Sequence, residues 1–266
     1  MHPVLLTIPL LGGIKIYTYG LMYALAALTT IYISTYLGKK DGYAPDKLMD
    51  LSFYLIIGNL TGARILYIIT DWQRFADHPL DMFKIWEGGL VFFGGLLGAI
   101  AVGLYLVPKY KMSFLKAADF YMPGLAIGHA IGRLGCLASG CCYGKPMPDF
   151  PFSITFPSQA FTLAPPGIPL FPSQLAESIC LFIVGSFLLY LWFRKRFDGQ
   201  VFLIYLMMYS VIRSVLEIFR GDSVRGFLID PWLSTSQFIS LCLIIIALVV
   251  YKYLSRKPRL EKLESL

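Results

Sequence analysis

Charged side chains are scarce in this chain. Of its 266 residues, 23 are Lys or Arg and 16 are Asp or Glu, together 15%, whereas ordinary soluble domains have about 25%. Hydrophobic residues make up 57%. Intrinsic disorder is excluded because it requires the opposite balance. A soluble enzyme is disfavoured because one core of this length cannot bury so much apolar surface. The composition predicts a polytopic membrane protein.

Other absences narrow the class further. No basic cluster precedes the first apolar run, and Ala24-Leu25-Ala26 lies inside that run, so a cleaved signal peptide is not expected. The last apolar run has no lysine at its middle, since Lys252 lies at its end, and this excludes a retinal-type receptor.

The chain has five cysteines, three of them close together in sequence. A metal site at Cys136, Cys141 and Cys142 is possible, but the three lack the paired spacing of common zinc sites, and His129 lies a further two turns back. Neither a metal nor a cofactor is expected. At the outer end of a span a disulfide can persist, and a quinone-linked disulfide oxidoreductase is the other class that this cluster suggests.

Seven apolar runs are long enough to cross about 30 Å of hydrocarbon, which takes roughly 20 residues. The runs are Tyr17–Leu37, Met49–Thr70, Leu90–Val107, Phe114–Ala138, Ser173–Phe193, Gln200–Phe219 and Ser236–Leu254. The sequence therefore predicts an all-α integral membrane protein with seven transmembrane helices, in which residues 1–266 form one domain.

Basic residues are unevenly shared between the two sets of connections. One set holds 14 Lys and Arg and the other holds six; the first comprises 38–48, 108–116, 194–199 and 252–266, and the second 1–16, 71–89, 139–172 and 220–235. Because cytoplasmic loops are richer in Lys and Arg, the N-terminus is expected outside and the C-terminus in the cytoplasm. The outer loop 139–172 holds eight of the 16 prolines and is expected to form a Pro- and aromatic-rich cap.

Three basic residues remain, and all lie inside predicted spans: Arg64, Arg133 and Arg213. Each is five or six residues from the outer end of its span, about 8–9 Å below the surface at ~1.5 Å per residue. An intramembrane arginine costs about 2.5–3.5 kcal/mol, so it normally faces a partner, a cavity or a ligand. Two interpretations stay open: structural pairing with Glu177 and Glu217, or binding of a lipid phosphate, which a guanidinium bonds through two oxygens at once.

Small residues recur at four-residue spacing in three of the predicted spans. This spacing lets helix backbones approach closely in lipid, and it is found at Gly58 and Gly62, at Gly94 and Gly98, and at Gly124, Gly128 and Gly132. His129 lies one turn before Arg133 and is either a packed polar group or a base.

The stretch from Gly128 to Pro146, GHAIGRLGCLASGCCYGKP, resembles the signature of bacterial prolipoprotein diacylglyceryl transferases, in the branch that has cysteines in this motif. Further pieces match in the family order: Tyr19-Gly-Leu-Met-Tyr23, Gly62-Ala-Arg64, Pro172-Ser-Gln174 with Glu177, and Arg213-x3-Glu217-x2-Arg220. The resemblance covers nearly the whole chain, and the family's seven-span fold agrees with the topology expected from charge.

The resemblance implies a reaction at the outer leaflet of the bacterial cytoplasmic (inner) membrane. The diacylglyceryl group of phosphatidylglycerol would move to the lipobox cysteine of a preprolipoprotein signal peptide, with release of glycerol 1-phosphate; membrane lipid is a partner and nucleic acid is not. The catalytic residues it implies are Arg133, Arg213 and Tyr19. The substrate-binding residues would be Arg133, Arg64, Gly144, Glu217, Arg220, Gln174, Cys136 and His129.

The chain also departs from the family pattern. Phe93 stands where many members have a histidine proposed as the base for the thiol, Phe171 stands where His is common, and Cys136 replaces an asparagine. A phenylalanine cannot accept a proton, so thiol activation must come from the arginine field or from another group, with Tyr19 or His129 as candidates. A diverged paralogue that binds phospholipid but has another acceptor, or none, is the alternative function.

Overall fold

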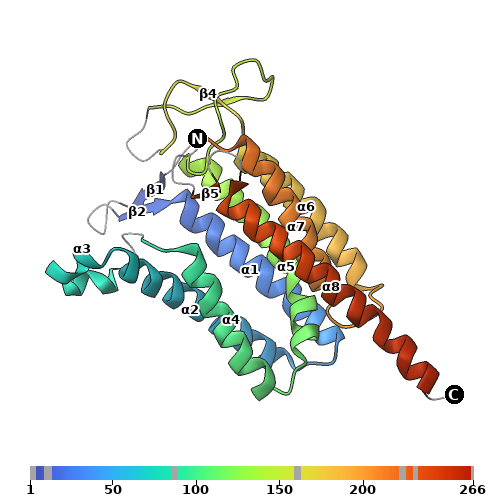
Figure 1. Cartoon of the computed structure of the whole chain (residues 1–266). Helices are drawn as coiled ribbons and strands as arrows, with labels where there is room; N and C mark the ends of the chain where they lie inside the picture. The colour runs from blue at the N-terminus through green and yellow to red at the C-terminus, as the bar shows by residue number, and fades with distance from the viewer. Residues whose placement is uncertain are drawn as a thin grey trace. The chain divides into compact units, whose positions relative to one another are not determined.

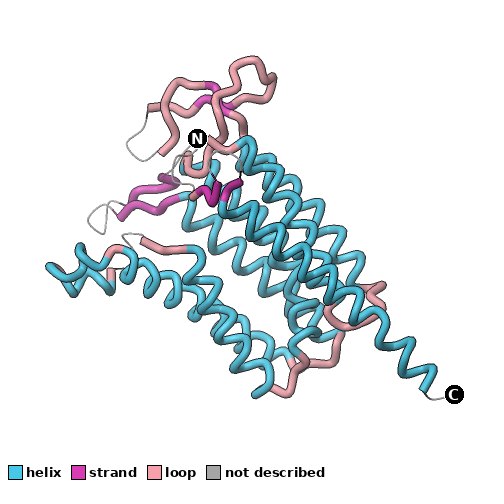
Figure 2. The backbone as a smooth tube through the Cα atoms, viewed as in Figure 1, coloured by secondary structure: helices cyan, strands magenta, loops and turns pink. Residues whose placement is uncertain are grey.

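The computed structural model describes residues 4–8, 14–84, 89–158, 163–221, 226–229 and 233–264. Within them, long helices dominate (Figures 1 and 2). The helices are α1 (Thr18–Lys40), α2 (Pro45–Thr70), α3 (Trp72–Asp77), η2 (Pro79–Phe83), α4 (Phe92–Lys109), α5 (Phe114–Ser139), α6 (Ser173–Trp192), α7 (Gln200–Phe219) and α8 (Thr235–Glu264).

The seven predicted apolar runs all coincide with long helices. Six of these helices, counted over the described residues, are long and apolar enough to cross a membrane: α1, α2, α4, α6, α7 and α8. The remaining run corresponds to α5, which is 26 residues long but carries His129, Arg133 and several glycines, and these lower its mean hydropathy. The chain is thus a multi-pass helical membrane protein, while a seventh span and the orientation stay predictions.

The expectation of an all-helical fold is wrong in detail. Three short antiparallel pairs join strands near helix ends in the described residues. They are β1 (Val4–Ile8) with β2 (Ile14–Tyr17), β3 (Ile154–Thr155) with β4 (Pro169–Leu170), and β5 (Phe227–Ile229) with β6 (Leu233–Ser234). Sequence periodicity missed them because strands this short bury too little surface to show an alternating pattern.

The chain divides into two compact units, one of Met1–Ile33 with Ala118–Leu266 and one of Ser34–Ala117. In the second unit α2 packs on α4 through facing glycines. A Cβ on Gly62 would collide with the carbonyl oxygen of Gly94, and a Cβ on Gly98 with that of Gly58. The prediction that these four glycines let backbones approach is confirmed.

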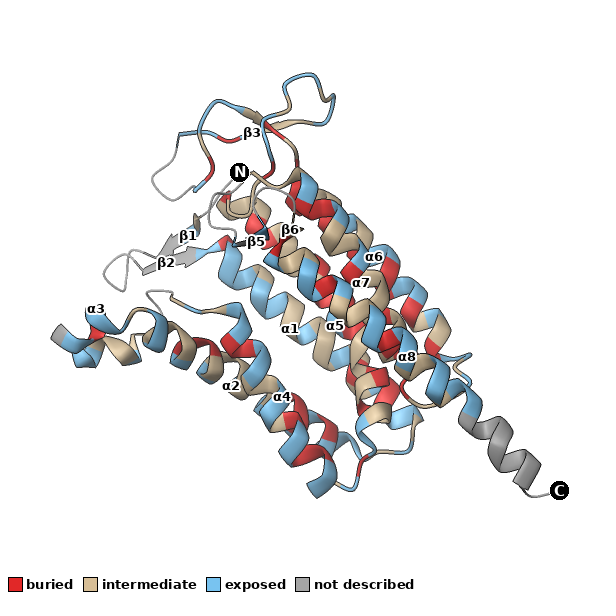
Figure 3. Cartoon of the chain, viewed as in Figure 1, coloured by how far each residue is buried: buried red, intermediate tan, exposed pale blue. Residues whose placement is uncertain are grey.

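In the first unit α6 packs on α7, and α7 packs on α8. The buried share of the apolar stretch is 39% in α6 and 33% in α7 against 11% in α8, so α6 and α7 are more enclosed than α8 (Figure 3). Gly128 of α5 fits against Thr30 and Ala26 of α1, as its spacing predicted. At Gly132 a Cβ would meet no other atom of the described residues within 4 Å, so its predicted packing role is not found.

A buried carboxylate joins α5 to the start of α7. Asp119 has no exposed surface, and its oxygens accept hydrogen bonds from the backbone N–H of Gly199 at 2.8 Å and of Phe202 at 3.0 Å. Lys195 Nζ lies 3.4 Å from the same carboxylate. Because the first N–H groups of a helix lack intrahelical acceptors, Asp119 satisfies the N-terminus of α7 from a neighbouring helix.

The segment 139–172, described except for 159–162, has a small hydrophobic core of its own. Phe156, Ala164 and Leu170 are buried there, and Leu137 and Tyr143 pack against them. The described part of this segment is therefore locally packed, while its role as a cap stays a prediction. Its place at the outer membrane surface stays a prediction.

Candidate functional site

Arg133 of α5 forms an ion pair with Glu177 of α6. Its Nη2 lies 2.9 Å from Glu177 Oε1, and the two side chains are only 13% and 4% exposed. One turn away the helices are tied directly, because Ser178 Oγ donates a hydrogen bond of 2.8 Å to the carbonyl oxygen of Ala130. A buried charge is tolerated only when it is paired, so each side chain offsets the free-energy cost of burying the other.

A second ion pair lies within α7. Arg213 Nη2 is 2.7 Å from Glu217 Oε2, and these side chains are 17% and 4% exposed. The two residues are four apart, so they lie on the same face of the helix. Glu217 therefore holds the Arg213 guanidinium in place, whereas a contact of Glu217 with the substrate stays a prediction.

Tyr209 and His129 lie beside the first pair. The Tyr209 ring lies 5.4 Å from the His129 ring, centroid to centroid. His129 Nε2 is 3.9 Å from Glu177 Oε1. Sequence reasoning missed Tyr209, although its place one turn before Arg213 could have indicated that it faces the same side.

The ion pairs leave part of each guanidinium unused. Arg133 Nε and Arg213 Nη1 are buried and have no hydrogen-bond acceptor among the described residues. Buried donors are nearly always bonded, so two orphan donors on neighbouring arginines need an explanation. Structural pairing with Glu177 and Glu217 is confirmed as to partners, but it does not account for these donors. An anionic ligand would supply acceptors for both donors.

The loop after α5 lies against the end of α7 and the segment before α6. Gly144 pairs with Arg220 as an antiparallel bridge, and the N–H of Lys145 donates to the Phe219 carbonyl at 2.8 Å. A Cβ on Gly144 would collide with the carbonyl oxygen of Phe171, so only glycine fits. The Phe171 ring stacks on Phe219 at 4.8 Å, which gives this departure from the family pattern a packing role.

Residues at the start of α6 hold the same loop. Gln174 Nε2 donates to the Cys141 carbonyl and Ser173 Oγ to the Cys142 carbonyl, each at 2.8 Å. Gln174 is 1% exposed. The observed contact of this predicted substrate-binding residue is thus with the loop that carries two cysteines.

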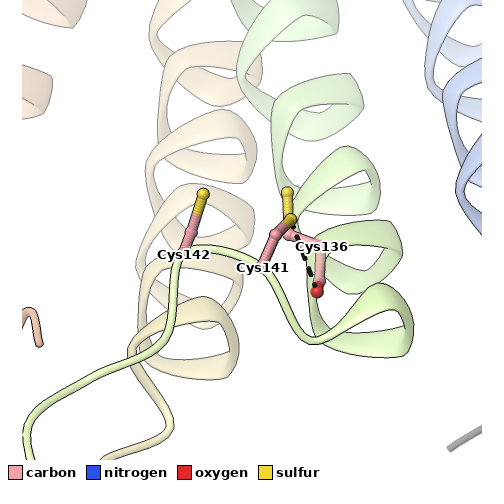
Figure 4. A group of neighbouring side chains, drawn as sticks. All are labelled: Cys136, Cys141 and Cys142. Carbon is pink, nitrogen blue, oxygen red and sulfur yellow. Dashed lines mark hydrogen bonds between the residues drawn. The ribbon is translucent and has the colours of Figure 1, made fainter. Parts of the chain in front are cut away.

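Cys136, Cys141 and Cys142 come together in space. Their Sγ atoms all lie within 4.8 Å of one another, and Figure 4 shows them grouped where the end of α5 meets the following loop. All three are free thiols. The Cys141 thiol donates a hydrogen bond of 3.8 Å to the carbonyl oxygen of Cys136.

Tyr19 lies in the first turn of α1, beside this cluster. A Cβ on Gly135 would lie 3.3 Å from Tyr19 Cδ2, which places the ring against the residue that precedes Cys136. The Tyr19 side chain is 46% exposed. It is therefore both near the cysteines and accessible.

Arg64 belongs to the second unit and has backbone partners. Its Nε donates to the Met82 carbonyl at 2.9 Å, its Nη2 to the Asp81 carbonyl at 2.6 Å and its Nη1 to the Gly89 carbonyl at 3.2 Å. The residue is 8% exposed, and its guanidinium lies 5.4 Å from the Phe75 ring centroid. These bonds stabilise the connection between α2 and α4. A substrate contact by Arg64 stays a prediction.

The fold and the paired arginines define a multi-pass membrane protein with two buried arginine–glutamate ion pairs. A profile of the prolipoprotein diacylglyceryl transferases matches residues 3–253. The chain belongs to the prolipoprotein diacylglyceryl transferase family, as its signature residues predicted.

Curated relatives match along nearly their whole length. The phosphatidylglycerol–prolipoprotein diacylglyceryl transferase of Clostridium tetani is 39% identical, with 94% of this chain and 97% of the relative covered. The transferase named as number 2 in Clostridium perfringens is 37% identical over 94% and 95%. The enzyme of Acinetobacter baumannii is 32% identical over 93% and 91%.

Proposed function

We propose that this protein transfers the diacylglyceryl group of phosphatidylglycerol to the lipobox cysteine thiol of preprolipoproteins. The names of its relatives support both substrates. The observation that carries the proposal is the pair of buried arginines with donors left over, Arg133 Nε and Arg213 Nη1. A phosphodiester is the anion that guanidinium groups bind best, since two oxygens are bonded at once.

In this proposal the sulfur of the acceptor attacks the glyceryl carbon that carries the phosphate oxygen. A sulfur–carbon bond forms, the carbon–oxygen bond breaks, and glycerol 1-phosphate leaves with the electron pair. Negative charge grows on the phosphate as that bond breaks, and Arg133 and Arg213 would stabilise it in a poorly solvated site. Glu177 and Glu217 hold the two guanidinium groups in place beforehand, so no reorganisation is needed during the reaction.

Other predicted residues act around this centre. Gly144 and Arg220 shape the loop beside α7, and Gln174 holds that loop from α6. The uneven distribution of Lys and Arg is the reason to expect the site towards the outer leaflet of the cytoplasmic membrane, where secreted preproteins emerge. These assignments belong to the proposal.

The test is transfer in a defined system. Full-length protein in phosphatidylglycerol proteoliposomes is mixed with a fluorescent lipobox peptide, and the product is read by the mass gain of one diacylglyceryl group. A peptide with serine in place of the lipobox cysteine and vesicles lacking phosphatidylglycerol are the controls, and neither should give product. Complementation of a strain depleted of its own transferase repeats the test in cells. Properly inserted protein that modifies no peptide in either setting would favour the diverged paralogue.

A further inference from the structure

We propose that Cys136, Cys141 and Cys142 form a zinc site whose fourth position binds the acceptor thiol. The identity of that thiol rests on the proposed function, whereas metal binding by the three cysteines does not. Sequence spacing alone disfavours a metal here, because the three residues are not arranged in the usual pairs. The folded chain brings them together in spite of the spacing.

The separation of the sulfurs suits a tetrahedral ion. Zinc–sulfur bonds of about 2.3 Å at tetrahedral angles put sulfurs about 3.8 Å apart. The three Sγ atoms lie within 4.8 Å of one another, so closing on an ion takes at most ~1 Å of movement. Figure 4 shows the three side chains in one group, with the Cys142 sulfur apart from the other two, and thiolates are the ligands that select soft or borderline ions such as zinc.

The backbone around the cluster is held firmly. Cys136 is part of α5, and its carbonyl oxygen accepts the N–H of Cys141 at 3.1 Å. Ser173 and Gln174 bond the carbonyls of Cys142 and Cys141. Cys142 has φ of +58°, a left-handed conformation that costs a non-glycine residue roughly 1–2 kcal/mol. Strain of this kind is concentrated at functional sites, because the surroundings must maintain it.

The electrostatic surroundings also suit a thiolate-bound ion. Three thiolates around one zinc ion carry a net charge of −1. Arg133 lies one helical turn before Cys136 in α5, and Arg220 pairs with Gly144, two residues after Cys142, so two cations near the cluster offset that charge. The cluster therefore lies next to the arginine that the proposed function assigns to the phosphate.

Three protein ligands leave zinc an open position, which is the arrangement of catalytic sites. His129 is two helical turns before Cys136, about 10 Å along α5, so it is poorly placed to close that position. A thiol that coordinates zinc loses its proton to solvent and remains as a thiolate. Its sulfur would then form the bond to the glyceryl carbon as glycerol 1-phosphate leaves. The site would thereby supply the thiol activation that Phe93 cannot supply.

The first test measures metal directly and needs no turnover. Full-length protein is purified in detergent under reducing conditions, and its zinc content per chain is measured by elemental mass spectrometry. Cobalt replacement then reports the ligands through thiolate charge-transfer absorption. Cys136→Ser, Cys141→Ser and Cys142→Ser should each lose zinc and the cobalt band. Cys180→Ser and Cys242→Ser, in α6 and α8, are matched controls that should keep both.

The second test links the ion to the acceptor. Addition of the lipobox peptide to the cobalt protein should shift the d–d absorption, and the serine peptide should not. Zinc binding that survives all three serine variants is adventitious and overturns the site, as does metal-free protein with a disulfide among these cysteines. Metal-free protein that still transfers at the full rate refutes the inference and leaves the proposed function standing. Metal-loaded protein that transfers nothing refutes the proposed function and leaves the metal site standing.

Discussion

Replacing Arg133 by alanine should change both the stability of the protein and its transfer activity, and the two effects must be measured separately. The first is stability, since Glu177 is 4% exposed and would lose the partner whose nitrogen lies 2.9 Å away. Removing one member of a buried ion pair, so that the other is left unpaired, costs about 3–5 kcal/mol of stability. A typical domain is stable by about 5–15 kcal/mol, so a loss of activity in the single variant can reflect unfolding alone.

The second effect is on transfer. A hydrogen bond to a charged group contributes about 1.5–3 kcal/mol, and a guanidinium that bonds two phosphate oxygens contributes about twice that. A loss of about 3–6 kcal/mol corresponds to a fall of roughly 10²–10⁴-fold in kcat/KM. Arg133→Lys keeps a positive charge for Glu177 but loses the fork, so we expect it to remain folded and to lose about 10- to 200-fold.

The assay is peptide transfer in proteoliposomes, with thermal unfolding measured on the same preparations. The double variant Arg133→Ala with Glu177→Gln removes the unpaired charge, and we expect it to regain stability without regaining transfer. Arg194→Ala, an exposed arginine just after α6, is the matched control and should retain both. If the double variant transfers within tenfold of the unaltered protein, Arg133 has only a structural role and the phosphate assignment is wrong.

Three further predictions concern the fold that positions the site. Gly98→Ala should weaken the packing of α4 on α2 and lower the unfolding temperature, because the new Cβ meets a backbone carbonyl that cannot move aside. Gly103→Ala is the control: its nearest neighbour is a side-chain atom at 3.8 Å, so its unfolding temperature should not change. Asp119→Ala should lower the free energy of unfolding by about 2–4 kcal/mol, measured in denaturant titrations, because two N–H groups of α7 lose a charged acceptor; an unchanged midpoint would contradict that role. Gly144→Ala should reduce both stability and transfer by displacing the loop after α5, whereas Gly132→Ala, with open space around it, should unfold like the unaltered protein in the same calorimetric scan.

Much of the helical architecture could be predicted from the sequence, for a simple reason. In lipid every backbone polar group must be bonded within the segment, so an apolar run of about 20 residues has almost no alternative to a helix. The observed bounds of α7, Gln200–Phe219, match the predicted run. The other helices differ by at most four residues at an end, except that α8 continues ten residues beyond the predicted Leu254. The short strand pairs had no comparable signal.

The candidate site was predictable in its charges but not in its contacts. Arg133 and Arg213 were conspicuous because lipid would exclude them, and Glu177 and Glu217 were the carboxylates available to pair with them. Tyr209 was not conspicuous, because a tyrosine in a membrane helix is common and the His129 ring beside it lies on another helix.

The sequence by itself determined the class of protein, its family and the residues whose burial demands a purpose. Composition and spacing are local properties, and they suffice for those conclusions. Only the tertiary structure decided that the arginine pairs retain buried donors, that Gln174 holds a loop, and that three irregularly spaced cysteines converge. Such contacts join helices distant in sequence, and they depend on packing that no local pattern records.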